Sequence, residues 1–291
     1  MKAIHLMGGL LLTAVLSMAA VDVMAHEQGD TLARIAKTGE FRIGYRTDAS
    51  PLSYENADGV PAGYSVDLCR RIAVAIKTHL KRDDIEIKFV PVTSENRIKS
   101  VINGDIDIEC GSTTMTMGRQ EQVDFTLLTF VTGGSILSLA ENNVPTLADL
   151  AGKKVGVMKD TTTLVKLKQY LQENLIDAEV ITIADRKEGM KRLNGHDIDA
   201  FASDQIVLIG QVIEALYPKQ YSLSEETFSY EPYALMVPRN DAEFRLVANK
   251  ALTQLYRSGQ HVQIYNKWIG RIGIRPSPVL MAMYQLNVLP E

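Results

Sequence analysis

The stretch Asn103-Gly-Asp-Ile-Asp-Ile-Glu-Cys-Gly-Ser-Thr-Thr114 decides how this chain folds. Its apolar residues at 106, 108 and 110 alternate with acidic residues at 107 and 109, which is the two-residue period of a β-strand. Gly104 ends a short helix that we expect over 97–103. Hydroxyl side chains follow directly after the strand, at 112–114. This order predicts one unit of an α/β sheet, in which ligands sit beyond the carboxyl ends of the strands.

The segments before this stretch alternate strand and helix in the same way. We expect a strand at Phe41–Tyr45, a helix with an apolar stripe at Tyr64–Leu80 and a strand at Ile85–Val90. Together with the helix and strand around Gly104, they give the order β-α-β-α-β. This order predicts the α/β fold class, with a mostly parallel sheet flanked by helices.

A second unit of similar design begins at Pro145. It contains an expected strand at Lys154–Met158 and an expected helix at Thr162–Glu173, and the alternation continues as far as a helix at Gln205–Ala215. The two units also open alike, with Thr-Leu-Ala-Arg-Ile-Ala at 31–36 and Thr-Leu-Ala-Asp-Leu-Ala at 146–151. The repetition indicates two lobes of one design.

Two apolar, extended segments link the units and indicate how the lobes divide the chain. Residues 125–131 and 228–237 are expected to be hinge strands, and the helices after residue 240 are expected to return to the first unit. We therefore expect lobe 1 to contain residues 26–129 plus 232–291, and lobe 2 to contain residues 130–231.

The composition excludes several classes of protein. The 291 residues carry 31 Lys and Arg against 35 Asp and Glu, a net charge of −4, and no basic block indicates a nucleic-acid partner. Two cysteines are too few for a disulfide scaffold or a four-cysteine zinc site. The histidines do not cluster, and the common zinc, nucleophile-elbow and phosphate-loop motifs are absent. We expect neither a metal nor a cofactor.

The first 25 residues read as a signal peptide. Lys2 precedes an apolar run, and Val23-Met-Ala25 ends it with a small-residue cleavage site, although an uncleaved membrane anchor is the alternative. No later stretch is apolar enough to span a membrane, so the mature protein is expected to be exported. Cys69 and Cys110 then face an oxidising compartment, where they form either a disulfide or two buried thiols.

Charged and hydroxyl side chains follow the expected strands of both units. In the first unit two of them are arginines, and in the second one is an aspartate. Arg can hold a carboxylate through paired hydrogen bonds, and a carboxylate can accept from an ammonium group. The set therefore suits a small zwitterion with an additional carboxylate. The alternative is that the arginines are solvated and that Ser94, Thr162 and Asp204 only cap helices. The set is Arg46, Ser94, Arg97, Ser112, Thr114, Thr162 and Asp204.

Three motifs carry a specific resemblance. Val92-Thr-Ser-Glu-Asn-Arg-Ile98, the 103–114 stretch and Arg119-Gln-Glu-Gln-Val-Asp-Phe-Thr126 resemble periplasmic amino-acid-binding proteins of ABC importers, and most of all their glutamate/aspartate-binding branch. The resemblance runs from about residue 31 to 270. It implies a two-lobed type II periplasmic-binding-protein fold, a periplasmic location, an amino-acid ligand and a membrane permease as partner.

The resemblance also implies a role for each site residue. Arg97 would hold the ligand's α-carboxylate with Thr114 and Thr162, while Ser112 and Asp204 would bind its ammonium group. Arg46 and Ser94 would face the side-chain carboxylate. Where the family has a histidine in lobe 2, this chain has Arg186.

The sequence departs from the family pattern in two further places. Asp48 lies near Arg46, where a neutral polar residue is expected, and would weaken the site for a second carboxylate by pairing with Arg46. A cysteine expected near residues 233–236 is missing, which leaves Cys69 as the only candidate partner of Cys110.

These observations favour a binding protein without catalysis, which we expect to be a monomer. Two alternatives stay open. One is a cyclohexadienyl or arogenate-type dehydratase on the same fold, with Glu109, Asp204 or Glu231 as the general acid. The other is the ligand-sensing domain of a receptor, which would normally carry a membrane span and a signalling domain after the binding unit.

Overall fold

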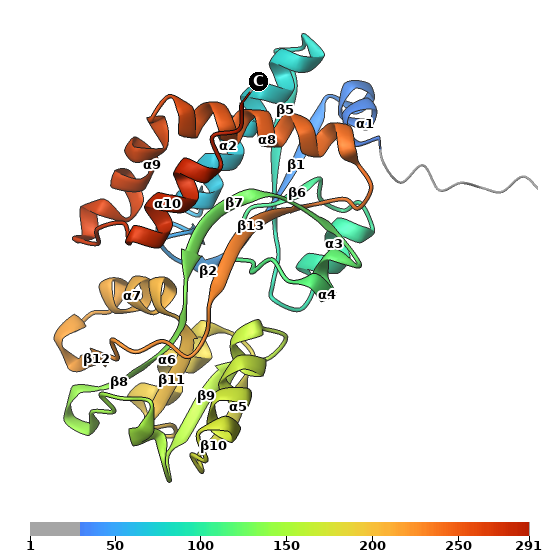
Figure 1. Ribbon diagram of the computed structural model, residues 1–291. Helices are drawn as coiled ribbons and strands as arrows, with labels where there is room; N and C mark the ends of the chain where they lie inside the picture. The colour runs from blue at the N-terminus through green and yellow to red at the C-terminus, as the bar shows by residue number, and fades with distance from the viewer. Residues whose placement is uncertain (1–29, 291) are drawn as a thin grey trace, which may run out of the picture.

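The computed structural model describes residues 30–290, which form two lobes joined by extended strands (Figure 1). The signal peptide expected at 1–25 lies outside these residues. The larger lobe is built on a five-stranded sheet, in which β1 pairs in parallel with β5 and β6, and β13 pairs antiparallel with β6 and β7. In sheet order the strands are β5 (Glu86–Pro91), β1 (Glu40–Tyr45), β6 (Ile108–Glu109), β13 (Glu231–Val237) and β7 (Asp124–Thr132).

The smaller lobe repeats this pattern of pairings. Its central parallel strand is flanked by two parallel neighbours, and two antiparallel strands complete the sheet. The two-lobed α/β fold is thus confirmed. Each sheet contains more antiparallel pairing than expected, because β8 and β13, the strands that follow the two crossings between the lobes, pair antiparallel with their neighbours. In order these strands are β10 (Glu179–Ile183), β9 (Lys154–Met158), β11 (Ala200–Asp204), β8 (Gly134–Leu139) and β12 (Tyr221–Leu223).

Helices cover both sheets, and several begin where the sequence pattern predicted. In the larger lobe they are α1 (Thr31–Thr38), α2 (Tyr64–Leu80), α3 (Arg97–Ile102), α4 (Met117–Gln120), α8 (Ala242–Arg257), α9 (Gln260–Trp268) and α10 (Pro278–Leu286). In the smaller lobe they are α5 (Thr162–Glu173), α6 (Arg186–Asn194) and α7 (Gln205–Glu214). A small sheet of β2 (Asp48–Ala49), β3 (Ser53–Glu55) and β4 (Pro61–Ala62) and short 3₁₀ turns at Ala140–Asn142, Ala148–Leu150, Pro218–Gln220 and Gly270–Ile272 complete the described chain. The C-terminal helix α10 was not predicted, and it packs against β7.

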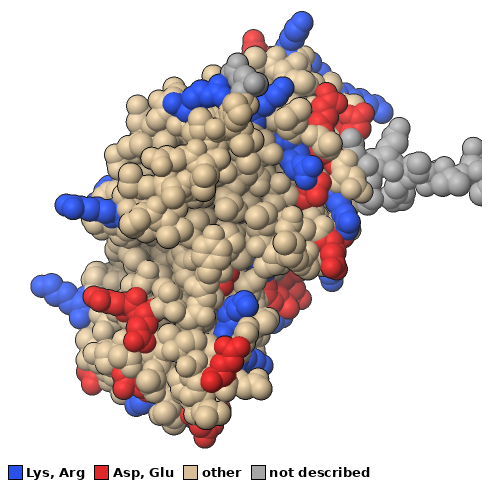
Figure 2. All heavy atoms as spheres, in the orientation of Figure 1, with Lys and Arg blue, Asp and Glu red and all other residues tan. Residues whose placement is uncertain are grey.

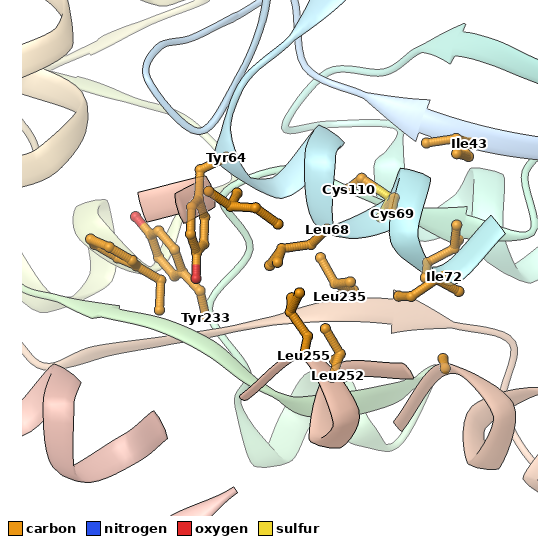
Figure 3. Packing of buried hydrophobic residues seen from close by; sticks show 14 of the residues in the cluster. Ile43, Tyr64, Leu68, Cys69, Ile72, Cys110, Tyr233, Leu235, Leu252 and Leu255 are labelled. Atoms are coloured by element: carbon orange, nitrogen blue, oxygen red, sulfur yellow. A yellow bond between two sulfur atoms is a disulfide. The ribbon is translucent and has the colours of Figure 1, made fainter. Parts of the chain in front are cut away.

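The main core lies between the larger sheet and its helices, and it includes a disulfide (Figure 3). Leu68 and Ile72 of α2 face Leu235 of β13 and Leu252 of α8 in this core. Cys69 of α2 is bonded to Cys110, with the two Cα atoms 6.3 Å apart. The bond ties α2 to the end of β6, which leads directly into the hydroxyl-bearing residues 112–114.

The two acidic residues that alternate with the apolar ones, Asp107 and Glu109, lie inside the larger lobe rather than at its surface. Asp107 accepts a hydrogen bond from the backbone N–H of Arg42 at 2.7 Å and forms ion pairs with the side chains of Arg34 and Arg42. Glu109 is fully buried. The alternation therefore identified a strand, but β6 covers only Ile108–Glu109 of the expected 106–110. Both faces of it are covered, as is usual for the inner strands of a helix-covered sheet.

The two crossings between the lobes lie side by side. β7 passes into β8 through Gly133, and the backbone of Gly134 is bonded to Phe228 and Ser229 of the return segment. A Cβ atom on Gly133 would lie 2.6 Å from the Ser229 carbonyl oxygen, so this close approach requires glycine. The boundaries that we propose for the lobes fall within β7 and at the first residues of β13.

Candidate functional site

The carboxyl ends of strands from both sheets border one small pocket between the lobes. Its volume is about 10 Å³, roughly the space that one water molecule needs, because the lobes touch around it. Seven of the eight predicted site residues line this pocket, and the eighth, Ser94, is buried behind β5 without lining it. The lining residues are Arg46, Arg97, Ser112, Thr114, Met158, Thr161, Thr162, Thr163, Arg186, Ala202, Ser203 and Asp204.

Arg97 is the first residue of α3 and only 3% exposed. Within residues 30–290, its guanidinium forms no hydrogen bond or ion pair, and its Nε is buried without a partner. Burial, reinforced by the charge of Arg119, lowers the pKa of Arg97 to about 10, so the group is still positive near neutral pH. A buried charge left without its partner costs about 3–5 kcal/mol, which an anion in the pocket would offset.

Arg46 and Arg186 come from different lobes and meet on one carboxylate oxygen. Asp48 Oδ1 accepts from Arg46 Nη2 at 2.8 Å and from Arg186 Nη1 at 3.0 Å. Arg46 follows β1 and Arg186 begins α6, and both are almost completely buried. Burial and the charge of Arg186 lower the pKa of Arg46 to about 10. The Nε atoms of both arginines are buried without partners among the described residues.

Asp204 closes the opposite wall of the pocket. It is the last residue of β11, and it accepts hydrogen bonds from Thr163 Oγ1 at 3.1 Å and from the hydroxyl of Tyr233. It makes no capping bond to α7, so the simple helix-cap interpretation is wrong. Burial, together with the neighbouring charge of Glu231, raises the pKa of Asp204. Such a carboxylate gains from a cationic partner, as an ammonium group would be.

Thr114 and Thr162 come from different lobes, and their hydroxyl oxygens lie 3.2 Å apart and share an acceptor. Their hydroxyls donate to Glu231 Oε2, Thr114 at 2.5 Å and Thr162 at 2.7 Å, while Ser229 donates to Oε1. The cap of α5 is Thr161, not Thr162, so the Thr162 hydroxyl is available for this bond. The first N–H groups of α5 point out of the helix without a helical carbonyl to bond. Glu231 thus connects the two lobes at the hinge.

Three further buried groups matter for the pocket: Ser112 belongs to the predicted set, and Arg119 and Glu109 extend it. The hydroxyl of Ser112 is buried and lacks a partner within the described chain, so it can still bind a ligand. Arg119, which carried no signal other than its place in a family motif, donates to the Thr114 carbonyl at 2.6 Å and fixes that loop. Glu109 lies beneath Gly111 with neither carboxylate oxygen bonded among the described residues. Burial raises the pKa of Glu109, whereas the charges of Arg97 and Arg46 act against the rise.

Contacts across the pocket show that the lobes are closed. Besides the Arg186–Asp48 pair, Lys159 Nζ lies 2.9 Å from Glu95 Oε2, and Gln211 donates to the Asp48 carbonyl at 3.3 Å. A Cβ atom on Gly210 of α7 would lie 2.1 Å from the Ser50 carbonyl oxygen in the other lobe. This separation leaves no room for any side chain other than that of glycine.

Residues 41–271 match the model of the bacterial extracellular solute-binding proteins, family 3. The chain belongs to this family. It is 36% identical to the L-glutamate/L-aspartate-binding protein of Pseudomonas aeruginosa, over 89% of this chain and 86% of that protein. It is 32% identical to the glutamate/aspartate import solute-binding protein of Salmonella typhimurium, over 89% and 87% of the two chains.

A solved structure of another protein has the same architecture as this chain. An ancestral arginine-binding protein bound to glutamine superposes with a TM-score of 0.71 at 28% identity, covering 80% of this chain and 98% of that one. Both sequence relatives are named as binding or import proteins rather than enzymes.

The face of the molecule shown in Figure 2 carries no large basic patch. On the face shown in Figure 2, acidic and basic side chains are interspersed mainly around the rim, so the pocket arginines are not part of a basic surface there. Among residues 30–290, no group of three or more His, Cys, Asp or Glu side chains is arranged to hold a metal ion. None of the helices in this part of the chain is both long and apolar enough to cross a bilayer.

Proposed function

We propose that this chain is a periplasmic solute-binding protein that captures glutamate or aspartate between its lobes and delivers it to the permease of an ABC importer. The observation that carries the proposal is the buried guanidinium of Arg97, which has no partner among the described residues, in the same pocket as the buried carboxylate of Asp204. An α-carboxylate and an α-ammonium group on one carbon atom match these two charges. The names of the sequence relatives support an acidic ligand.

Binding requires the lobes to separate and close again. A pocket of about 10 Å³ does not admit an amino acid, so the ligand enters an open state, and its contacts with both lobes stabilise a closed state in which the lobes stand slightly further apart than in this structure. Gly133 and the paired crossing segments form the hinge that we propose for this movement. The closed state would then be the form that the permease receives.

Calorimetry and thermal unfolding with all twenty standard amino acids test the proposal on the mature chain. We expect glutamate and aspartate to raise the melting temperature with a concentration dependence that follows the calorimetric affinity. Ligand at a hundred times its Kd should add about 2.7 kcal/mol to the free energy of unfolding. If no amino acid changes the melting temperature or produces heat, the proposal is wrong.

A dehydratase is the second candidate, and one feature favours it. The raised pKa of Asp204, caused by burial and by Glu231, is a property of a general acid that keeps its proton. Assays with prephenate and arogenate decide between the candidates. Turnover that disappears in Asp204→Asn would replace the binding proposal, and its absence in a protein that binds glutamate would end the dehydratase hypothesis.

A further inference from the structure

The two arginines at one end of the pocket, Arg46 and Arg186, are already bonded to a carboxylate of the protein, that of Asp48, which lies next to them without itself lining the pocket. Asp48 Oδ1 accepts from both guanidinium groups, at 2.8 Å and 3.0 Å, and no carboxylate pairs with Arg97 in this way among the described residues. Asp48 is also held by its backbone, because β2 pairs with β3 and Gln211 donates to its carbonyl oxygen. The carboxylate is therefore fixed from both lobes.

Asp48 is ionised under ordinary conditions. Burial acts to raise its pKa, but the charges of Arg186 and Arg46 and the hydrogen bonds from Arg186 outweigh burial, so the pKa is lowered. The two arginines and this aspartate together carry one net positive charge. Each arginine still presents a buried Nε without a partner in the described chain, so this end can bind one more acceptor.

Acidic and amide side chains would meet this end differently. A ligand carboxylate gains from the two arginines but comes to lie beside the negative charge of Asp48, and like charges in a binding interface disfavour association. An amide oxygen can accept from the same arginines, and its NH₂ group can donate to Asp48. The carboxylate of Asp48 therefore weakens the binding of a ligand with an acidic side chain and provides a hydrogen-bond acceptor for a ligand with an amide side chain.

We propose that Asp48 is a specificity-determining residue that reduces the preference for an acidic over an amide side chain, so that the site takes glutamate, aspartate and their amides as one ligand class. This inference rests on the proposed function, because it concerns the side-chain end of the same amino-acid site. It predicts that removing the charge of Asp48 makes the protein more selective for acids.

Calorimetric titration of glutamate, glutamine, aspartate and asparagine tests the proposal with wild type, Asp48→Asn and Asp48→Ser. In both variants we expect the glutamate-to-glutamine affinity ratio to rise by about tenfold or more, because the repulsion acts on the acid alone. Two variants of different shape keep the test decisive if one of them does not fold, which a thermal melt reveals.

Glu95→Gln is the matched control. Glu95 also supplies a carboxylate to an ion pair across the lobes, with Lys159 at 2.9 Å, but unlike Asp48 it bonds neither of the arginines that line this end of the pocket. Loss of a contact that only holds the lobes together changes the affinity for both ligands equally, so the ratio should stay at the wild-type value. A ratio unchanged in the folded Asp48 variants overturns the inference and leaves the proposed function intact. A wild-type protein that binds none of the four ligands overturns both.

Discussion

At one end of the pocket the guanidinium of Arg97 has no partner in the described chain, whereas at the other end Arg46 and Arg186 share the carboxylate of Asp48. Both ends are built from buried arginines that follow strands or begin helices. They differ in whether the protein neutralises the charge itself.

The difference separates two tasks of a binding site. An unpartnered buried cation attracts any anion of suitable size, so the Arg97 end can bind the group that all amino acids share. A cation already paired within the protein gains less from a new anion, so the Arg46 end responds to the details of the side chain. Affinity should therefore depend mainly on the first end and specificity on the second.

Replacing Arg97 should produce the largest effect. In Arg97→Met, which keeps much of the side-chain volume, we expect every amino-acid ligand to lose about 2–5 kcal/mol of binding free energy, the range for one partner of a buried charge pair. Because the wild-type charge is buried without a partner, the unliganded variant should unfold at no lower temperature than wild type. Calorimetry and thermal melts measure the two quantities.

The control for this variant is Lys99→Ala on the exposed side of the same helix, which should leave both quantities unchanged. Nearly unchanged affinity in Arg97→Met would remove Arg97 from the site. A strongly lowered melting temperature would mean instead that the guanidinium supports the fold.

Replacing Arg46 should have a smaller and more selective effect. In Arg46→Met the acid loses a charged hydrogen-bond donor worth about 1.5–3 kcal/mol, while the neutral amide loses less, so the glutamate-to-glutamine ratio should fall towards one. Arg42→Met is a matched control, because Arg42 lies on β1, which directly precedes Arg46, and pairs with Asp107 outside the pocket. Equal losses for acid and amide in Arg46→Met would contradict the proposed division between the two ends.

Lowering the pH should weaken ligand binding at the Arg97 end of the pocket but not at the Arg46 end. Burial and the charge of Glu231 raise the pKa of Asp204, and the ligand's ammonium group needs this carboxylate ionised. As the pH falls through the raised pKa, affinity should fall by up to about tenfold per pH unit. Asp48, with its lowered pKa, stays ionised over this range, so the glutamate-to-glutamine ratio should not follow.

The stability of the unliganded protein should change in the opposite direction. In the folded state Asp204 keeps its proton to higher pH than in the unfolded chain, so the folded state binds more protons between the two pKa values. Its contribution to stability is therefore present at low pH and is lost as the pH rises through the raised pKa. Titrations and melts of wild type and Asp204→Asn over about pH 4–7, a range that contains the raised pKa of about 6, measure both trends. Equal pH dependence in the two proteins would exclude Asp204 as the titrating group.

Periodicity and strand ends were sufficient to predict the lobes and most of the pocket. The helices at Tyr64–Leu80 and Thr162–Glu173 begin and end as predicted, because their apolar stripes and flanking loops are local features. Arg46, Arg97 and Asp204 meet because each lies at or directly after the carboxyl end of a strand or at the start of the next helix. The position of a side chain at the carboxyl end of a strand can be inferred from the order of strands and helices along the chain.

The bonds that cross between segments could not be predicted in the same way. Nothing local to Glu231 indicates that Thr114 and Thr162 both donate to it, since these residues are separated by up to 117 positions. The hydroxyl of Tyr233 reaches Asp204 only because β13 returns past the hinge. Pairing of Asp48 with Arg46 was predicted from their proximity in sequence, but the second bond, to Arg186, depends on lobe closure.

The smallest predicted effect concerns the hinge side of the Arg97 end. Thr162→Val removes one hydroxyl that donates to Glu231 across the lobes, and we expect a loss of about 0.5–1.5 kcal/mol of binding free energy, the usual contribution of one hydrogen bond. Because this bond favours closure rather than a particular side chain, glutamate and glutamine should lose the same amount, and Thr162→Ser should restore both. A change in their ratio, measured by calorimetry, would mean that the two ends are coupled through the hinge, and the division of affinity from specificity would then have to be abandoned.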